Sequence, residues 1–348
     1  MSVHPYQMES LTSYIGRSAA MKSMDSSSFL RNLFPPENYE TQIQIPSDLD
    51  AKGYGDFMAK LNEALDPEKR RLAQLTLPGT KPGVHIKWLR RAGGNCVDGD
   101  SFNADPAHAW CQRCLLEDLA SGNDEFLRLS WRMITRTFCW KHRRPLATHC
   151  LDCNDRQASP AFVYCGGAIS LVCGKCSSTY ATQLGLPDMA ASTALKLGKN
   201  HRVQAAWNGA IQFEMGLERS LVDPSKKKDK GAFRDFSLAL ANMLMKSKNS
   251  RHSPIDIFSS AAFPAIKNPA NISNMSRPYR ASSMAVRRKA HGLVASLLKN
   301  RVNLFSIKGL QQGQWGRDPT FQELRANLEP EQNAEIDRLL LRFPASWY

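Results

Sequence analysis

Paired metal-binding residues constrain this chain more than any other feature of its sequence. The chain contains four pairs, each with two intervening residues: Cys111 and Cys114, Cys139 and His142, Cys150 and Cys153, Cys173 and Cys176. The second pair follows the first after 24 residues, the third follows after seven, and the fourth follows after 19. Two ligands at this spacing lie on one tight turn, here called a knuckle, and two knuckles complete the tetrahedral shell of a zinc ion. The sequence therefore predicts two structural zinc sites.

The remaining metal-binding side chains leave alternatives open. Free thiols, a redox motif, a single zinc ion or shared ligands would also use these cysteines. Cys165 could compete with Cys173 for the second ion, whereas Cys96 lies in a glycine-rich stretch and is interpreted as a loop thiol. His108 and His149 are expected near the sites or at the surface, and are not expected to bind metal. Zinc ions with four protein ligands have no open position, so catalysis by these metals is not expected.

Composition and charge narrow the class of protein further. The chain has 348 residues, 42% of them hydrophobic and 22% charged, which is typical of a soluble globular protein of two or three domains. No apolar stretch approaches the roughly 20 residues that span a bilayer, and the first residues do not resemble an export signal. The net charge is +14, and the segment 226–308 alone holds 17 Lys and Arg against three Asp. This excess favours a polyanionic partner, either DNA or RNA phosphates.

The periodicity of apolar residues predicts a mainly α fold with small β zinc ribbons. We expect an N-terminal helical domain over 1–105, in which an ordinary helical core and a helix-turn-helix are equally good interpretations. Residues 106–185 are expected to form the double zinc-binding region, and 186–348 a basic C-terminal helical domain. Within the zinc-binding region, a short helix is predicted over 115–120. Alternating apolar residues predict a half-buried strand over 126–138.

Five basic residues are candidates for contacts with nucleic acid or with a partner: Arg277, Arg280, Arg287, Arg288 and Lys289. The last three belong to a predicted amphipathic helix over 284–300, whose basic side chains are expected largely off its apolar face. Such a helix suits a helix-turn-helix that contacts phosphates, or an RNA-bearing partner. A merely solvated basic face is the alternative.

Several of these motifs together resemble the TniQ family of transposition proteins. The resemblance rests on WCQRCLLED, LRLSWRMITRTFCWKH, RRPLATHCLDC and CGKC, and on PYQMESLTSYIGR near the N-terminus. The N-terminal residues that match the family are Pro5, Glu9, Ser10, Leu11, Ser13 and Arg17, and Leu75-Thr76 resembles a further short motif. The sequence departs from the family pattern at Gln112, at Trp140 and in the additional Cys165.

The resemblance implies a non-catalytic target-selection adaptor. Some members dock on an RNA-guided Cascade complex and link it to the transposition AAA+ ATPase and transposase, whereas others recognise a DNA attachment site directly. We expect docking on Cascade, because the chain is short for a protein that recognises a DNA site directly. Residues 1–185 also show no concentrated cationic face in the sequence. A homodimer would suit an adaptor. A bacterial, cytoplasmic and nucleoid-associated location follows, with no membrane contact. Dispersed acids and isolated histidines argue against an enzyme such as a nuclease.

Overall fold

The computed structural model describes residues 3–35, 48–51, 55–65, 72–77, 88–90, 108–155, 158–183, 200–222, 234, 237–242, 244–245, 279, 282–306, 330 and 334. The chain divides into two compact units. Unit 1 contains residues 1–93 and 105–187, and unit 2 contains 94–104 and 188–348. Unit 1 therefore holds both the N-terminal helices and the cysteine-rich region, which the sequence analysis assigned to separate domains. The three-domain division stays a prediction.

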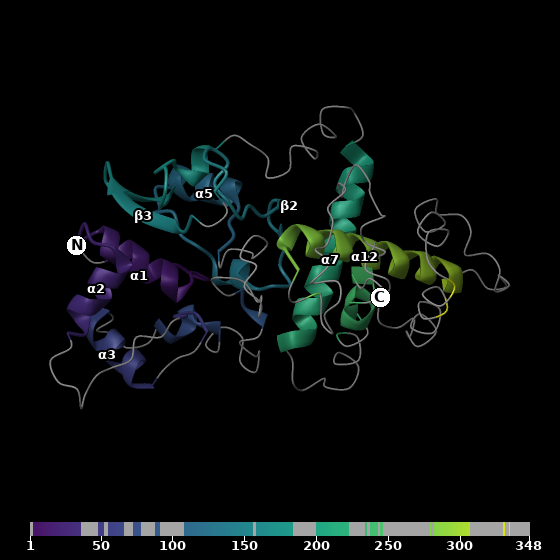
Figure 1. The fold of residues 1–348 in the computed structure, drawn as a ribbon, viewed down its shortest axis with the longest axis horizontal. Coiled ribbons are helices and arrows are strands. Elements are labelled where there is room, and N and C mark those ends of the chain that lie inside the picture. The colour runs from purple at the N-terminus through teal and green to yellow at the C-terminus, as the bar shows by residue number, and fades with distance from the viewer. Residues whose placement is uncertain are drawn as a thin grey trace. The chain divides into compact units, whose positions relative to one another are not determined.

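Three helices build the N-terminal part of unit 1 (Figure 1): α1 (Leu11–Ala20), α2 (Ser26–Leu33) and α3 (Gly55–Leu65). Ser10 caps α1, since its side chain accepts a hydrogen bond from the Ser13 amide, and Asp25 caps α2 in the same way. The three helices and the short 3-10 helix η2 (Leu72–Leu75) share one core, whose buried side chains include Leu11, Ile15, Phe29, Leu61 and Leu72.

The cysteine-rich part of unit 1 consists of one helix and two small hairpins. Helix α5 (Gln112–Ala120) contains the helix that was predicted over 115–120, and it begins earlier, at Gln112. The first hairpin pairs β1 (Phe138–Cys139) with β2 (Arg144–Pro145), and the second pairs β3 (Pro160–Cys165) with β4 (Ala168–Cys173). Gly166 and Gly167 form the turn of the second hairpin with positive φ values of 62° and 91°. The small strands in a mostly helical molecule agree with the predicted fold class.

The predicted strand over 126–138 is wrong. This segment contains the 3-10 helix η5 (Leu129–Arg132), and its ladder pairing is limited to isolated bridges before β1 begins at Phe138. Apolar and polar side chains alternate here, but both sets are buried, including Ser130 and Arg132. The alternation therefore does not mark a strand with one solvated face. It reflects polar residues that find buried partners elsewhere in unit 1.

Helix α1 crosses the second hairpin at very close range. A Cβ atom placed on Gly16 would lie 2.3 Å from the Phe162 ring on β3, closer than any real carbon contact. Only glycine at position 16 therefore permits this approach. The contact places the opening helix directly against a strand that begins 144 residues later in the chain, at Pro160.

Unit 2 contains two long helices, α7 (Asn200–Val222) and α12 (Met284–Ser306), which pack against each other. Leu240 and Leu244 are fully buried in this unit. Polar side chains are also enclosed: His291 lies 2.8 Å from the Tyr279 hydroxyl and 2.9 Å from Glu214 Oε1. None of the helices that the structure describes is both long and apolar enough to cross a membrane. Residues 223–233 and 246–278, which make up much of the basic segment 226–308, lie outside the described residues.

Candidate metal centres

The first four predicted ligands lie together in unit 1. Cys111 and Cys114 lie at the start of α5, Cys139 ends β1, and His142 lies in the turn between β1 and β2. A helix N-terminus and a tight hairpin thus supply the two knuckles. Their ligand atoms all lie within 4.8 Å of one another. The positive end of the α5 dipole also faces a site that carries thiolates, which favours their negative charge.

The distances within this first cluster fit a tetrahedral ion. Sulfur atoms of Cys114 and Cys139 are 3.6 Å apart, and His142 Nδ1 lies 3.3 Å from Cys114 Sγ and 3.4 Å from Cys111 Sγ. A tetrahedron with ordinary zinc bond lengths has S–S edges of about 3.8 Å and S–N edges of about 3.6 Å. Hydrogen bonds from the neighbouring thiols also lower the pKa of Cys139, so this sulfur favours the thiolate form that binds metal. The four side chains therefore could hold zinc.

Glu117 contacts the side of the His142 ring that faces away from the first cluster. Its Oε1 lies 2.7 Å from His142 Nε2, while Oε2 lies 2.6 Å from the Lys141 ammonium. The arrangement fixes the imidazole with Nδ1 toward the sulfur atoms, as carboxylate partners commonly do for histidine ligands. Glu117 was not identified in the sequence analysis. Its position, three residues after Cys114 on a predicted helix, was the available signal.

The second cluster is made of four cysteines. Cys150 and Cys153 lie in the turns before β3. Cys173 ends β4, and Cys176 completes the knuckle that Cys173 begins. The Cys150 and Cys176 sulfur atoms are 3.5 Å apart, and those of Cys153 and Cys173 are 3.7 Å apart. Gln183 donates from Nε2 to the Cys150 sulfur at 3.0 Å. This set also matches the edges of a zinc tetrahedron.

The remaining candidates lie apart from both clusters. Cys165, at the end of β3, is exposed, and the fourth position of the second cluster is filled by Cys173. His108 and His149 join neither cluster among the described residues. Burial, with Arg132 and Arg90 nearby, lowers the pKa of His108 to about 3 and keeps its ring neutral. Cys96 lies outside the described residues.

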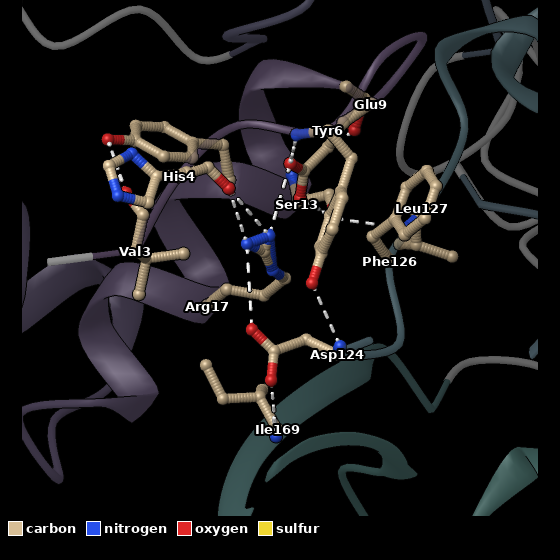
Figure 2. A network of polar contacts seen from close by, with 12 residues as sticks. Val3, His4, Tyr6, Glu9, Ser13, Arg17, Asp124, Phe126, Leu127 and Ile169 are labelled. Atoms are coloured by element: carbon tan, nitrogen blue, oxygen red, sulfur yellow. Dashed lines mark hydrogen bonds and ion pairs between the residues drawn. The ribbon is translucent and has the colours of Figure 1, made fainter. Parts of the chain in front are cut away.

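A buried ion-pair network joins the N-terminal segment to the cysteine-rich region (Figure 2). Arg17 donates to the carbonyl oxygen of His4 at 2.8 Å and to Glu9 Oε2 at 3.3 Å, and it also lies 3.6 Å from Asp124 Oδ2. The guanidinium stacks over the Tyr6 ring, and its side chain is only 1% exposed. Burial raises the pKa of Glu9 to about 7, against the opposing effect of Arg17.

Hydrogen bonds extend this network to the second hairpin. Ser13 donates to Glu9 Oε1 at 2.8 Å and accepts a bond from the Leu127 amide at 2.9 Å. Asp124 accepts from the Ile169 amide on β4 at 2.9 Å. The N-terminal motif singled out in the sequence thus has a structural explanation, because three of its four polar members, Glu9, Ser13 and Arg17, belong to this network and the fourth, Ser10, caps α1.

A second buried pair anchors η5. Arg132 contacts Asp50 and Asp48, and its Nη2 also donates to the Arg90 carbonyl oxygen at 2.8 Å. Asp50 in turn accepts from the Thr12 amide at the start of α1. Burial raises the pKa of Asp50, while Arg132 opposes that shift. Leu75 and Thr76, the other family-like motif, are also buried, and the Leu77 amide donates to the Asp50 carbonyl oxygen.

The structure places the predicted basic residues of unit 2 differently from expectation. Arg287, Arg288 and Lys289 are 2%, 6% and 1% exposed on α12, where a face largely open to solvent was expected. The Arg287 guanidinium donates to the carbonyl oxygen of Ser282 at 2.6 Å. These side chains therefore present no open basic face in this structure. Arg277 and Arg280 lie outside the described residues, and their contact with a partner stays a prediction.

Unit 1 is thus defined as a helical domain fused to two closed Cys/His clusters of the structural-zinc type. Comparison with known families gives a narrower assignment. Residues 1–146 match the family model described as TniQ, a region that includes α1, α2, α3 and the whole first cluster. This match supports a TniQ family transposition protein, and with it a transposition-associated function. No curated protein matches the sequence of the chain.

Proposed function

We propose that this protein is a non-catalytic target-selection adaptor in DNA transposition that carries two structural zinc ions. The TniQ match over 1–146 carries the proposal. The cluster chemistry supports it, because each group offers four protein ligands and a site closed in this way has no position for substrate or reactive water. The zinc ions would stabilise a region of small strands, with an apparent binding free energy of about 10 to 16 kcal/mol per site.

As an adaptor, the protein would link an RNA-guided Cascade complex to the transposition AAA+ ATPase and transposase. Burial of Arg287, Arg288 and Lys289 favours this mode over direct recognition of a DNA site. A helix that reads bases must present its side chains to the major groove, and these three are enclosed within unit 2. Docking on a protein complex does not require them. A sequence-specific DNA-binding protein remains the second candidate function.

Two measurements on the purified protein separate the two modes. A docking adaptor is expected to co-purify with Cascade in fixed stoichiometry and to bind duplex DNA weakly, with little dependence on its sequence. A direct reader would bind one sequence about 10³-fold or more tightly than random DNA, because base contacts add to phosphate contacts. The experiment compares Cascade co-purification with gel-shift titration against a duplex library at constant salt. Tight sequence-specific binding by the protein alone would overturn the docking mode.

A further inference from the structure

Four basic side chains gather around the first metal cluster: Arg113, Lys141, Arg143 and Arg144. We call this set the knuckle surface. Arg113 lies between the two cysteines on α5, and Lys141 and Arg143 lie in the turn of the β1–β2 hairpin. Arg144 pairs directly opposite Cys139 in the ladder. Arg113, Lys141 and Arg143 are exposed, with Lys141 at 67%, and Arg144 is half-buried.

Glu117 connects Arg113 on the helix with Lys141 on the hairpin. Arg113 and Glu117 are four residues apart on α5, a spacing that places both on one helix face. Lys141 reaches Glu117 from the hairpin at 2.6 Å. The helix and the hairpin therefore present their cations side by side, although 27 residues separate Arg113 from Lys141 in the chain.

Two other arginines in this part of unit 1 are neutralised by acids. Arg128 pairs with Asp118 at 2.8 Å, and Arg132 pairs with Asp48 and Asp50. Among the described residues, no acid pairs with Arg113 or Arg144. A zinc ion with three thiolates and one imidazole carries a single net negative charge. Arg113, Lys141 and Arg144 outnumber that charge together with Glu117 even when Arg143 is left out, so the surface remains positive when metal is bound.

We propose that the knuckle surface binds the phosphate backbone of a nucleic acid without reading its sequence. Exposed arginines and lysines held on a rigid metal-stabilised turn are suited to phosphate oxygens, since arginine offers paired donors and lysine a point charge. The sequence analysis found no concentrated cationic face in residues 1–185. The folded chain produces one by joining α5 to the β1–β2 hairpin. This inference adds a phosphate contact to the proposed adaptor and does not depend on docking to Cascade.

The test replaces Arg113→Gln, Arg143→Asn and Arg144→Gln together and leaves Lys141 in place, because Lys141 contacts Glu117. Asparagine is chosen at 143 because that residue has a positive φ of 51°. The matched control is Lys175→Gln. Lys175 holds the corresponding position in the last knuckle of the second cluster and is 64% exposed, but it pairs with Asp155 at 2.7 Å.

Binding is measured by fluorescence anisotropy with a labelled random-sequence DNA duplex and, in a second arm, a single-stranded RNA, over about 50 to 200 mM salt. The triple variant is expected to bind at least about 10-fold more weakly, and the slope of log K against log salt should fall by about 2 to 3. A change in one arm only identifies the duplex or the single strand as the ligand. The proposal would be overturned if the triple variant kept the wild-type salt slope, or if Lys175→Gln lost as much nucleic-acid binding as the triple variant. It would also be overturned if the wild type bound neither nucleic acid.

Zinc content and Cascade co-purification are measured on the same samples. Lost phosphate binding with unchanged zinc and unchanged Cascade binding supports the knuckle surface as an independent contact. If the triple variant loses zinc, the single Arg113→Gln variant replaces it, with an expected slope change of about 0.7 to 0.9. Failed co-purification with retained phosphate binding would contradict the adaptor mode and leave this inference intact.

Discussion

His142 and Glu117 face each other at 2.7 Å, with the imidazole Nε2 toward the carboxylate and Nδ1 toward three cysteine sulfur atoms. One ring nitrogen of His142 thus faces the cysteine sulfur atoms, and the other contacts the Glu117 carboxylate. A hydrogen bond from Nε2 to the carboxylate leaves the Nδ1 lone pair available for the ion. Because Glu117 lies on α5 and His142 lies in the β1–β2 turn, their contact connects the helix to the hairpin.

Replacing Glu117→Ala should weaken zinc binding at the first cluster by about 10 to 100-fold, because the imidazole loses the group that orients it. Competition with a chromogenic chelator measures the affinity of each site. The second cluster serves as the internal reference and should keep its affinity. Equal affinity of both sites in the variant and the wild type would show that Glu117 does not support His142.

Purified protein should contain two zinc ions per chain, since eight ligand atoms form two tetrahedral groups. Replacing Cys139→Ser should remove one ion and unfold the hairpin that β1 and β2 form. Cys165→Ser is the matched control, because that cysteine is exposed and lies outside both clusters. Metal analysis by mass spectrometry gives the stoichiometry. One equivalent or less in folded wild-type protein would contradict the assignment.

Replacing Arg17→Met should lower the free energy of unfolding of unit 1 by about 3 to 5 kcal/mol, because Glu9 is then left buried without its cation. The double variant with Glu9→Gln should recover part of this loss, and the pair of single variants completes a double-mutant cycle. Arg31→Met on the exposed face of α2 is the control, with an expected change below about 0.5 kcal/mol. Denaturant titration at saturating zinc measures the free energy of unfolding of the wild type and of the four variants. Strict additivity would argue against coupling between Arg17 and Glu9.

Glu125 should make the stability of unit 1 dependent on pH. Burial raises the pKa of this carboxyl to about 7, and its Oε2 accepts from the Leu171 amide. The folded state then binds more protons than the unfolded state, so the stability that protonated Glu125 contributes is complete below pH about 4.5 and is lost as the pH rises through 7.

The isosteric change Glu125→Gln removes this titration. The variant should therefore gain stability relative to the wild type between pH 5 and 8, by roughly 2 kcal/mol at the upper end. The difference between the two proteins is compared at each pH, because low pH also releases metal from both. Glu63→Gln, at an exposed position of α3, should follow the wild-type curve. Parallel curves for Glu125→Gln and the wild type would contradict the raised pKa.

The two metal clusters show what a linear spacing reveals about a fold. A knuckle is a local structure, so Cys111 with Cys114, and Cys173 with Cys176, were recognisable as pairs without knowledge of the rest of the chain. The supporting side chains were harder to find. Gln183 reaches the Cys150 sulfur from 33 residues away, and no local pattern encodes that contact.

Errors arose where distant residues satisfy a polar group. Arg132 was interpreted as the solvated side of a strand, but Asp48 and Asp50 enclose it from 82 or more residues away. On α12, Arg287 was likewise expected off the apolar face, as a candidate contact with phosphates or a partner, and the fold encloses it. Periodicity distinguishes apolar from polar residues, and it does not distinguish a solvated arginine from one that has a buried partner.

The position of Gly16 against Phe162 has a consequence for the order in which this protein assembles. Helix α1 is synthesised before its contact partners Leu127, Asp124 and Phe162, which follow more than 100 residues later in the chain. Contacts of such long range are slow to form, since the intervening loop must close first. Helix α1 therefore completes its packing only after the chain of the β3–β4 hairpin has been made.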